Sequence, residues 1–283
     1  MTPSPLVLFP KRAGWIVSAT LLLALAPIAK CDIRDTIQKA APGTTVTVSG
    51  TYTVNAKIVV PSGVTVKGPA TFRFTTGASA DGFSIPSANS GVVLQSLTVT
   101  GANHGIMIYG SNCSIQSCIA QYNFNTGIEI IGAAAKNNVV NNCQSKYNAD
   151  SSGGNADGFA CKFGSSTGNR FTNCDGHDNS DDGYDFAGAA APVSVSGCRA
   201  HNNGSYNGKQ GNGDGFKMGI AGDNAAHIYT SCTAYNNTKG NTGSGFDSNN
   251  NAATIHLTGC TSYGNKQGDR LQHVVLTNCS MQK

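Results

Sequence analysis

The sequence predicts an all-β solenoid that resembles the right-handed parallel β-helices and carries a short N-terminal capping helix. Two observations predict it. Glycine occurs 35 times among 283 residues while only 12% of residues are charged, which favours many tight turns over long helices. Short apolar runs also recur around cysteines at intervals typical of solenoid coils. With 39% hydrophobic residues, the chain can fill one sizeable core.

The repeat is marked by six cysteines, whose intervals all fall within the range of about 20–50 residues that is typical of solenoids. They are Cys118, Cys143, Cys174, Cys198, Cys232 and Cys260. An apolar residue precedes each by three positions, and an asparagine follows each by five: Asn123, Asn148, Asn179, Asn203, Asn237 and Asn265. Parallel coils place equivalent residues about 4.8 Å apart, so these asparagines are expected to form a hydrogen-bonded ladder at a turn.

The cysteine column has two interpretations. Neighbouring coils bring cysteines within disulfide range, so some pairs could be oxidised in a secreted protein. An earlier coil has Leu97 in the same position, however, and a position that accepts leucine is a small buried apolar site. We therefore favour a mostly reduced internal ladder. No CxxC pair or matched histidine spacing is present, which argues against a zinc site.

The chain divides into three segments. Residues 1–30 are predicted to be a signal peptide, because Lys11 and Arg12 precede an apolar run too short for a comfortable membrane span. Residues 31–57 are predicted to form the cap and the first strands. Asp32 caps a helix in which Ile33 and Ile37 share one face, and Pro42–Gly43 ends it. Residues 58–283 are predicted to be the β-helical catalytic domain.

These features predict a secreted, extracellular protein. No later segment could cross a membrane, so no membrane partner is expected. The net charge is only +4, and no Lys/Arg-rich footprint of a nucleic-acid binder occurs. We expect a monomer.

A second column of the repeat carries charge. A glycine opens one strand of each coil, and the residue after it is aromatic or aliphatic and points inward. The next residue therefore points outward, and this column reads Glu129, Ala160, Asp185, Lys217 and Asp247, continued by Arg270. Asp157 and Asp182 directly precede their glycines, and Asp181 precedes Asp182.

Two adjacent coils thus bring four carboxylates to one strand edge: Asp157, Asp181, Asp182 and Asp185. Four carboxylates repel one another unless a cation binds them, and that number of oxygen ligands suits Ca²⁺ better than Mg²⁺. Lys217 lies one coil further along the stack. Two simpler interpretations exist. The aspartates could be solvated turn residues, or Asp185, Lys217 and Asp247 could form a surface ion-pair ladder.

Other charged residues are expected at the surface. Lys162, Asp247 and Arg270 occupy outward positions from which they could contact a substrate, although an ordinary surface charge is the simpler interpretation for each. The six histidines are scattered along the chain, and most are expected at the surface or in turns.

From "NADGFACKF" to "GDGFKMG", the sequence resembles the family 9 polysaccharide lyases, the pectate lyase group built on a parallel β-helix. The similarity extends from about residue 90 to the C-terminus. It implies one essential Ca²⁺ held by Asp157, Asp181, Asp182 and Asp185, with Lys217 as the catalytic base. It also implies that polygalacturonate, the pectin backbone, is cleaved by β-elimination after removal of the C5 proton.

Two alternatives stay open at this stage. A polygalacturonase-like hydrolase on the same scaffold needs an acid and a base carboxylate, which Asp181 and Asp182 superficially offer. A non-catalytic β-helical adhesin or polysaccharide-binding protein is equally compatible with the fold alone.

Overall fold

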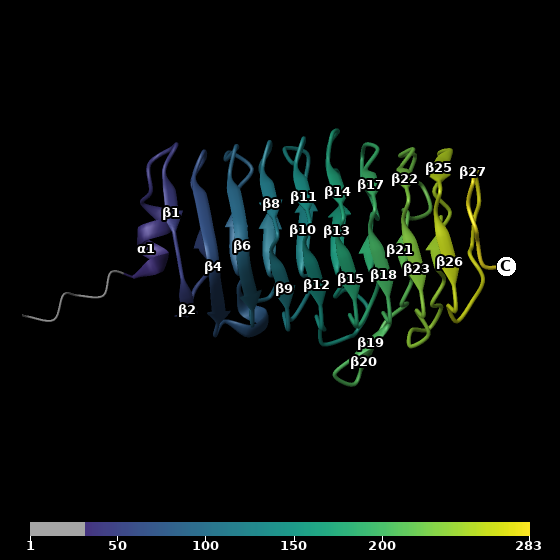
Figure 1. Ribbon diagram of the computed structural model, residues 1–283, viewed down its shortest axis with the longest axis horizontal. Helices are drawn as coiled ribbons and strands as arrows, with labels where there is room; N and C mark the ends of the chain where they lie inside the picture. The colour runs from purple at the N-terminus through teal and green to yellow at the C-terminus, as the bar shows by residue number, and fades with distance from the viewer. Residues whose placement is uncertain (1–31) are drawn as a thin grey trace, which may run out of the picture. The chain divides into compact units, whose positions relative to one another are not determined.

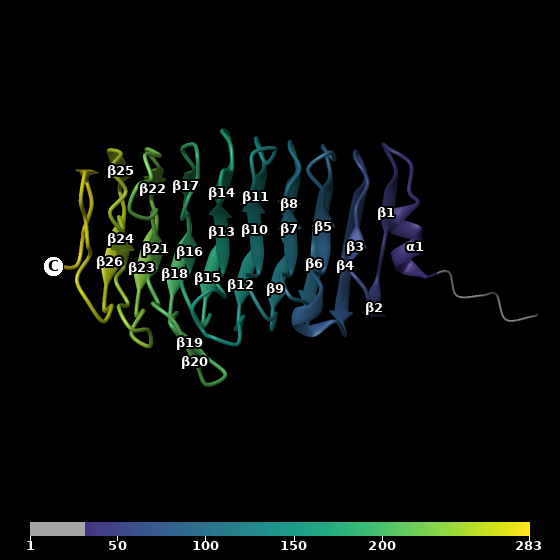
Figure 2. The ribbon, with the colours of Figure 1, turned by 180° about the vertical axis from the view of Figure 1, so that it is seen from behind.

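Parallel strands stack coil upon coil in the computed structural model, which describes residues 32–283 (Figures 1 and 2). The predicted signal peptide, residues 1–30, lies outside the described residues. Within residues 32–283, no helix is long and apolar enough to cross a membrane. The chain advances along one axis, so residues one coil apart become neighbours in space.

One wall of the solenoid is an eight-stranded parallel sheet. Its strands, in spatial order, are β3 (Ile58–Val59), β5 (Phe83–Ile85), β7 (Ile106–Ile108), β10 (Ile128–Ile131), β13 (Phe159–Lys162), β16 (Tyr184–Asp185), β21 (Phe216–Lys217) and β24 (Phe246–Asp247). From β5 onward, each strand directly follows a glycine or a glycine-containing turn, as the sequence predicts. We call this sheet the site sheet, because it carries the predicted catalytic residues.

The other strands form a 17-stranded sheet that folds into two walls. The first wall contains β1 (Thr45–Thr47), β4 (Thr65–Phe74), β6 (Val93–Thr100), β8 (Ser114–Gln116), β11 (Val139–Asn141), β14 (Arg170–Thr172), β17 (Ser194–Ser196), β22 (Ile228–Thr230), β25 (Ile255–Thr258) and β27 (Val274–Thr277). The second contains β2 (Gly50–Val54), β9 (Ile119–Gln121), β12 (Gln144–Lys146), β15 (Asp175–His177), β18 (Arg199–His201), β23 (Thr233–Tyr235) and β26 (Thr261–Tyr263). The long strands β4 and β6 contribute to both walls.

The strand register confirms the predicted all-β coil and its columns. The apolar residues that precede the cysteines are direct partners from coil to coil, as in Val140 with Phe171 and Val195 with Tyr229. On the site sheet, the rings of Tyr184 and Phe216 stack at 4.7 Å inside the solenoid. Burial of these stacked apolar side chains supplies the main stabilisation of the fold.

The predicted asparagine ladder is present and buried. From Asn148 onward, each amide oxygen accepts hydrogen bonds from both the backbone N–H and the side-chain amide of the asparagine one coil earlier. Asn179 Oδ1, for example, accepts from Asn148 at 3.2 and 2.9 Å, and the Asn179 amide donates to Asn203 at 3.1 Å. The polar groups of these buried turns thereby have hydrogen-bond partners although water does not reach them. The nine cysteines among residues 32–283 are free, in agreement with a reduced ladder.

The N-terminal helix covers one end of the core, as predicted. In α1 (Ile33–Gln38), the Asp32 side chain accepts a hydrogen bond from the Arg34 N–H, and Ile37 is fully buried. The Gln38 side chain accepts a hydrogen bond from the backbone N–H of Val59 in β3. The helix thus supplies a hydrogen-bond partner for the first strand of the site sheet. The helix ends at Gln38, before the predicted stop at Pro42–Gly43. Beyond it, β1 and β2 already pair with β4.

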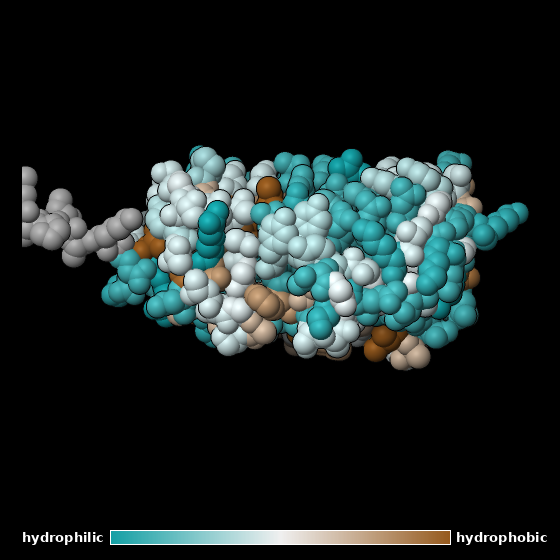
Figure 3. All heavy atoms as spheres, turned by 90° about the horizontal axis from the view of Figure 1, so that it is seen from below, coloured by the Kyte–Doolittle hydropathy of each residue, from teal (hydrophilic) through white to brown (hydrophobic). Residues whose placement is uncertain are grey.

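Small elements lie on the outside of the coils. A 3₁₀ turn (Gly77–Ser79) follows β4, and an antiparallel hairpin, β19 (Ser205–Tyr206) with β20 (Lys209–Gln210), projects from the solenoid (Figure 1). In Figure 3, hydrophilic residues dominate the face seen from below, and apolar residues appear as small separate groups.

Candidate functional site

The structure brings all five predicted site residues together on three adjacent coils. Asp157 lies just before β13, and Asp181 and Asp182 lie just before β16. Asp185 and Lys217 are direct register partners on β16 and β21. The glycine turns place the aspartates at the entrance of each strand, and strand alternation turns Asp185 and Lys217 away from the apolar core.

Each of the four aspartates has one carboxylate oxygen held by a backbone N–H. These bonds bind the carboxylates to the polypeptide frame rather than to mobile side chains. The donors are the N–H of Asp182 to Asp157 (3.2 Å), of Asn212 to Asp181 (2.7 Å), of Asp214 to Asp182 (2.7 Å) and of Ala187 to Asp185 (2.9 Å). The second oxygen of each is left for other partners. Such fixed carboxylates are pre-oriented for binding a cation.

Three of these carboxylates meet closely enough to share a metal ion. One oxygen from each of Asp157, Asp181 and Asp182 lies within 4.8 Å of the others. Asp182 Oδ2 is buried and receives no hydrogen bond. Its ion-pair partner is Lys217, whose Nζ lies 3.4 Å away. A carboxylate oxygen that is buried without a hydrogen bond is stabilised by a bound cation, so this donor set fits a hard, oxygen-liganded ion such as Ca²⁺.

Burial and mutual repulsion alter the acidity of the cluster. Burial raises the pKa of Asp157 to about 7, although Lys162 opposes the shift. Burial and the charge of Asp181 raise the pKa of Asp182 well above its usual value, and burial also raises the pKa of Asp181. Asp185 behaves differently: burial acts to raise its pKa, but Lys162 and Lys217 outweigh burial and lower it. Without added positive charge, the cluster therefore resists full ionisation.

Lys217 is directed into the cluster. Its Nζ lies 3.2 Å from Asp185 Oδ2 and 3.4 Å from Asp182 Oδ2, and only 13% of its side chain is exposed. Burial acts to lower the pKa of Lys217, but the surrounding carboxylates, with Asp182 first, outweigh burial and raise it. Lys217 and Asp185 are therefore a largely buried pair and not an exposed ion-pair ladder.

Lys162 is a member of the cluster that sequence analysis missed. The expectation of a surface charge is wrong, because Lys162 is only 8% exposed and its Nζ lies 2.7 Å from Asp157 Oδ2 and 2.8 Å from Asp185 Oδ2. The alternation of side chains along a strand correctly predicted that Lys162 points away from the core. The signal that could have revealed its role is its place on β13, two residues after Ala160, the register partner of Asp185, and on the same outward face.

The column of charged residues continues beyond Lys217 to Asp247 and Arg270 as predicted, but Asp247 is buried. Asp247 is only 2% exposed, so the expectation of a surface charge is wrong for it too. Arg270 pairs with Asp247 in register and through its guanidinium, which also lies 3.6 Å from Asp214 Oδ2. Arg270 remains 45% exposed, in keeping with its predicted position.

Two histidines make contacts inside the fold, and only one of them, His227, departs from the expected surface or turn positions. His104 lies between two carboxylates, with Nδ1 2.8 Å from Asp81 Oδ1 and Nε2 3.1 Å from Glu129 Oε2. His227 is fully buried, and its Nδ1 accepts a hydrogen bond from the Val193 N–H. The positions of these histidines depend on contacts between coils, which single-sequence spacing does not report.

Two hollows that share Asn103 are lined mainly by residues from the turns that precede strands of the site sheet. The first includes Arg34 and Lys57, and the second includes Lys209 and the 47% exposed ring of Phe124. The second also includes Asp150, in the loop that leads to Asp157. Cationic groups beside an exposed ring form a surface that suits an anionic sugar chain.

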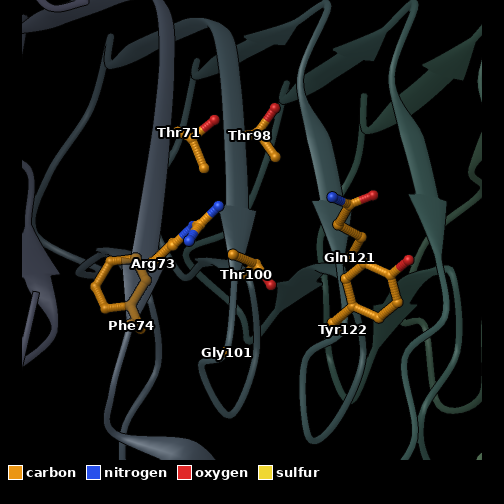
Figure 4. Close-up of a pocket in the computed structure, with 8 residues that line it drawn as sticks. All are labelled: Thr71, Arg73, Phe74, Thr98, Thr100, Gly101, Gln121 and Tyr122. Carbon is orange, nitrogen blue, oxygen red and sulfur yellow. The ribbon is translucent and has the colours of Figure 1, made fainter. Parts of the chain in front are cut away.

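A further hollow lies on the 17-stranded sheet and is separate from this cluster. Figure 4 shows the Arg73 side chain among threonine hydroxyls, with the ring of Tyr122 at the other side. Its lining residues come from β4, β6, β9 and the turns after them, none of which carries a predicted site residue: Thr71, Arg73, Phe74, Thr98, Thr100, Gly101, Gln121 and Tyr122.

Comparison with known proteins gives consistent relatives. The chain is 35% identical over 177 residues to pectate lyase L of Dickeya chrysanthemi, covering 60% of this chain and 41% of that one. It is 34% identical over 226 residues to pectate lyase L of Paenibacillus polymyxa, covering 69% and 49% respectively. The chain thus spans less than half the length of these two relatives.

Solved structures and a family model point to the same group of proteins as these two relatives. Pectate lyase Pel9A superposes with a TM-score of 0.75 at 26% identity, over 88% of this chain and 73% of that one. A rhamnogalacturonan lyase shares the fold, with a TM-score of 0.62 at 22% identity over 78% and 67%. Residues 25–278 match the model described as "Pel9A-like, right handed beta helix region". The chain therefore belongs to the Pel9A-like right-handed β-helix family, which confirms the predicted fold class and the suspected resemblance to the family 9 pectate lyases.

Proposed function

We propose that this chain is a calcium-dependent pectate lyase that cleaves polygalacturonate by β-elimination, with Lys217 as the base. The observation that carries the proposal is the frame of four buried aspartates, each with one oxygen fixed by a backbone N–H, beside the amine of Lys217. The pectate lyase names of its relatives support the same activity and substrate class.

The proposed ligands of Ca²⁺ are Asp157, Asp181, Asp182 and Asp185. Ca²⁺ takes six to eight oxygen ligands in flexible geometry, so four aspartates leave positions for water and a substrate carboxylate. When bound, the ion supplies positive charge that compensates the aspartates and stabilises the negative charge developing on that carboxylate. When Lys217 is neutral, Asp182 Oδ2 has neither a hydrogen bond nor the Lys217 ion pair, so it is the oxygen that the bound ion would stabilise most directly.

The proposed reaction uses the neutral form of Lys217, which a bound Ca²⁺ would favour because its charge opposes the carboxylates that raise the pKa of this amine. Its Nζ accepts the proton on C5 of a galacturonate residue, a proton acidified by the neighbouring C6 carboxylate. The electron pair of the C5–H bond forms the C4–C5 double bond, and the bond from C4 to the glycosidic oxygen breaks. That oxygen takes a proton from solvent and becomes the hydroxyl of a new reducing end. Because Lys217 lies on a strand, its amine is held in a fixed position for proton transfer.

The two hollows that share Asn103 are the proposed path of the polyanion. Lys57 and Lys209 are exposed there, and both can neutralise substrate carboxylates. The exposed ring of Phe124 offers an apolar face to a sugar ring. The path leads along the site sheet toward the aspartate cluster.

The experiment that tests the proposal is incubation of the purified chain with polygalacturonate, with and without Ca²⁺, reading the ultraviolet absorbance of the unsaturated product. We expect calcium-dependent absorbance that EDTA abolishes. New reducing ends without absorbance, formed equally well in EDTA, would instead identify a hydrolase. Binding of the polymer without any cleavage would identify a carbohydrate-binding module.

We further propose that the protein acts outside the cell, after cleavage of the signal peptide within or near residues 1–30. We also propose that it acts as a monomer. The apolar run after Lys11 and Arg12 supports export. N-terminal sequencing of protein from the culture medium and gel filtration with light scattering test these two points. An unprocessed N-terminus on protein that stays in the cell fraction, or a dimeric mass, would contradict them.

A further inference from the structure

A second group of potential metal ligands lies on the 17-stranded sheet, apart from the proposed catalytic residues. Asp175 and His177 belong to β15, and His201 belongs to β18. His177 and His201 are direct register partners, and their rings stack at 4.8 Å and 3°. One ligand atom from each of the three residues lies within 4.8 Å of the others. The site sheet contributes no residue to this group.

Asp175 supplies an unsatisfied oxygen to this group. The residue is 8% exposed, and its Oδ2 lies 2.6 Å from the Arg199 guanidinium. Its Oδ1 is buried and receives no hydrogen bond, although His201 Nε2 lies 3.2 Å away. Arg199 thus fixes the carboxylate and leaves the free oxygen directed at the imidazoles. A proton on His201 Nε2 can bridge it to this oxygen, and a metal ion in place of that proton would bind both atoms.

The opposite ring nitrogens of both histidines have their own partners. His177 Nδ1 lies 2.8 Å from Asp178 Oδ2, and Lys239 holds the other oxygen of Asp178 at 3.1 Å. A proton on Nδ1 leaves the lone pair of Nε2 available for a metal. The Asn202 Nδ2 lies 3.1 Å from His201 Nδ1, and the amide turned by 180° would present its oxygen to a proton there. Carboxylates and amides behind imidazoles are the usual supports of metal-ligating histidines.

We propose that Asp175, His177 and His201 bind a divalent transition metal ion, with Zn²⁺ as the best match. Two imidazoles and one carboxylate suit Zn²⁺, whereas Ca²⁺ prefers oxygen ligands alone. Tetrahedral Zn²⁺ with bonds of about 2.0–2.1 Å separates its ligand atoms by roughly 3.3 Å, a separation that small side-chain rotations can reach from this arrangement. The two imidazoles are each 14% exposed, so a water molecule can take the fourth position.

The sequence carries a signal for this site that is neither a CxxC pair nor a local histidine spacing: two histidines separated by one coil of the repeat. His177 and His201 each follow a ladder cysteine by three positions, so they are separated by the same interval as Cys174 and Cys198. In a solenoid, ligands separated by one coil length are adjacent in space. A bound ion would cross-link two neighbouring coils.

The test is a titration of the full-length, EDTA-stripped protein with Zn²⁺ in excess Ca²⁺, which occupies the aspartate cluster. We expect about one equivalent of Zn²⁺ per chain by calorimetry, and Co²⁺ in its place should give the visible bands of tetrahedral coordination. His177→Gln and His201→Gln should each weaken binding about tenfold or more. The matched control His256→Gln, at an exposed position on β25, should bind as the wild type does.

Circular dichroism and thermal unfolding of the metal-free variants establish that they fold. The proposal is wrong if the wild type binds no Zn²⁺ above the level of the His177→Gln/His201→Gln double variant. It is also wrong if Co²⁺ bound to the wild type shows only octahedral spectra, because the proposed site has three protein ligands and one water in tetrahedral geometry. Neither result depends on lyase activity, so failure here leaves the proposed function untouched.

Discussion

Asp185 and Lys217 are partners in register on adjacent strands, and the Lys217 Nζ lies 3.2 Å from Asp185 Oδ2. The repeat places the same backbone position in each coil, and a single change of side chain puts an amine where the previous coil has a carboxylate. Only the coil geometry makes these two residues neighbours, because a whole coil of chain separates them in sequence. The amine therefore meets the carboxylates at a fixed position on a rigid frame.

The first prediction concerns Lys217. Lys217→Ala removes the proposed base and should lower kcat by about 10²–10⁴-fold, the range that a positioned general base contributes. Lys217→Arg should be similarly inactive, since a guanidinium stays protonated. Initial rates of unsaturated product formation measure both. Lys136→Ala, which removes an exposed lysine, should retain wild-type rates. Wild-type turnover by Lys217→Ala would show that another group takes the proton.

The second prediction concerns calcium and Asp182. Saturating Ca²⁺ should raise the stability of the wild type, by about 2.7 kcal/mol at one hundred times its Kd. Asp182→Asn keeps an oxygen to accept the Asp214 N–H but loses the charge. We expect this variant to lose most of the calcium-induced rise in Tm measured by calorimetry. The exposed helix variant Asp35→Asn should show the full rise. An unchanged rise in Asp182→Asn would exclude Asp182 as a ligand.

The third prediction concerns Lys162, which neutralises Asp157 and Asp185 inside the cluster. Lys162→Met leaves the buried Asp157 carboxylate without its ion partner and Asp185 with Lys217 alone, and should cost about 3–5 kcal/mol of unfolding free energy in EDTA. Asp157→Asn in the same chain removes the stranded charge and should recover part of the loss. Urea unfolding of the wild type, both single variants and the double variant gives the coupling energy. Strictly additive effects would mean that the pair makes no energetic contribution.

The sequence predicts the coil, the ladders and the five proposed site residues, because all of them repeat at fixed offsets from Cys or Gly. A parallel solenoid converts such offsets directly into neighbours in space. Lys162 and Asp247 were misjudged because their burial depends on side chains of adjacent coils, which reach over the strand. His104 lies in a turn, as expected of most histidines, but its two partners come from other coils, with Asp81 on the coil before it and Glu129 on the coil after it. The sequence predicts which column of the repeat a residue belongs to, but it does not predict whether side chains of adjacent coils bury that residue.

The fourth prediction tests the asparagine ladder. Asn179→Ala removes a fully buried amide that accepts two hydrogen bonds from Asn148 and donates to the Ser145 carbonyl oxygen. Because these groups are then buried without partners, we expect a loss of about 2–4 kcal/mol in unfolding free energy. Chemical denaturation measures the loss. Asn55→Ala, at an exposed bend, should change stability by less than about 0.5 kcal/mol. Equal effects of the two substitutions would argue against a structural role for the ladder.

The last prediction concerns His104, which bridges Asp81 and Glu129. Burial acts to lower the pKa of His104, but the two carboxylates outweigh burial and raise it from 6.5 to about 9. The folded protein therefore keeps this proton between pH 6.5 and about 9, where the unfolded chain releases it. The resulting stabilisation is complete below pH 6.5 and is lost as the pH rises through about 9.

Its full size is about 3 kcal/mol, from about 1.36 kcal/mol for each unit of pKa difference. His104→Gln should remove this dependence while other titrating groups stay the same in both proteins. Urea unfolding at pH 6 and at pH 10 measures the difference: the wild type should lose about 3 kcal/mol more than His104→Gln between the two values. Parallel losses in the two proteins would show that the His104 bridge is not protonated in the folded state.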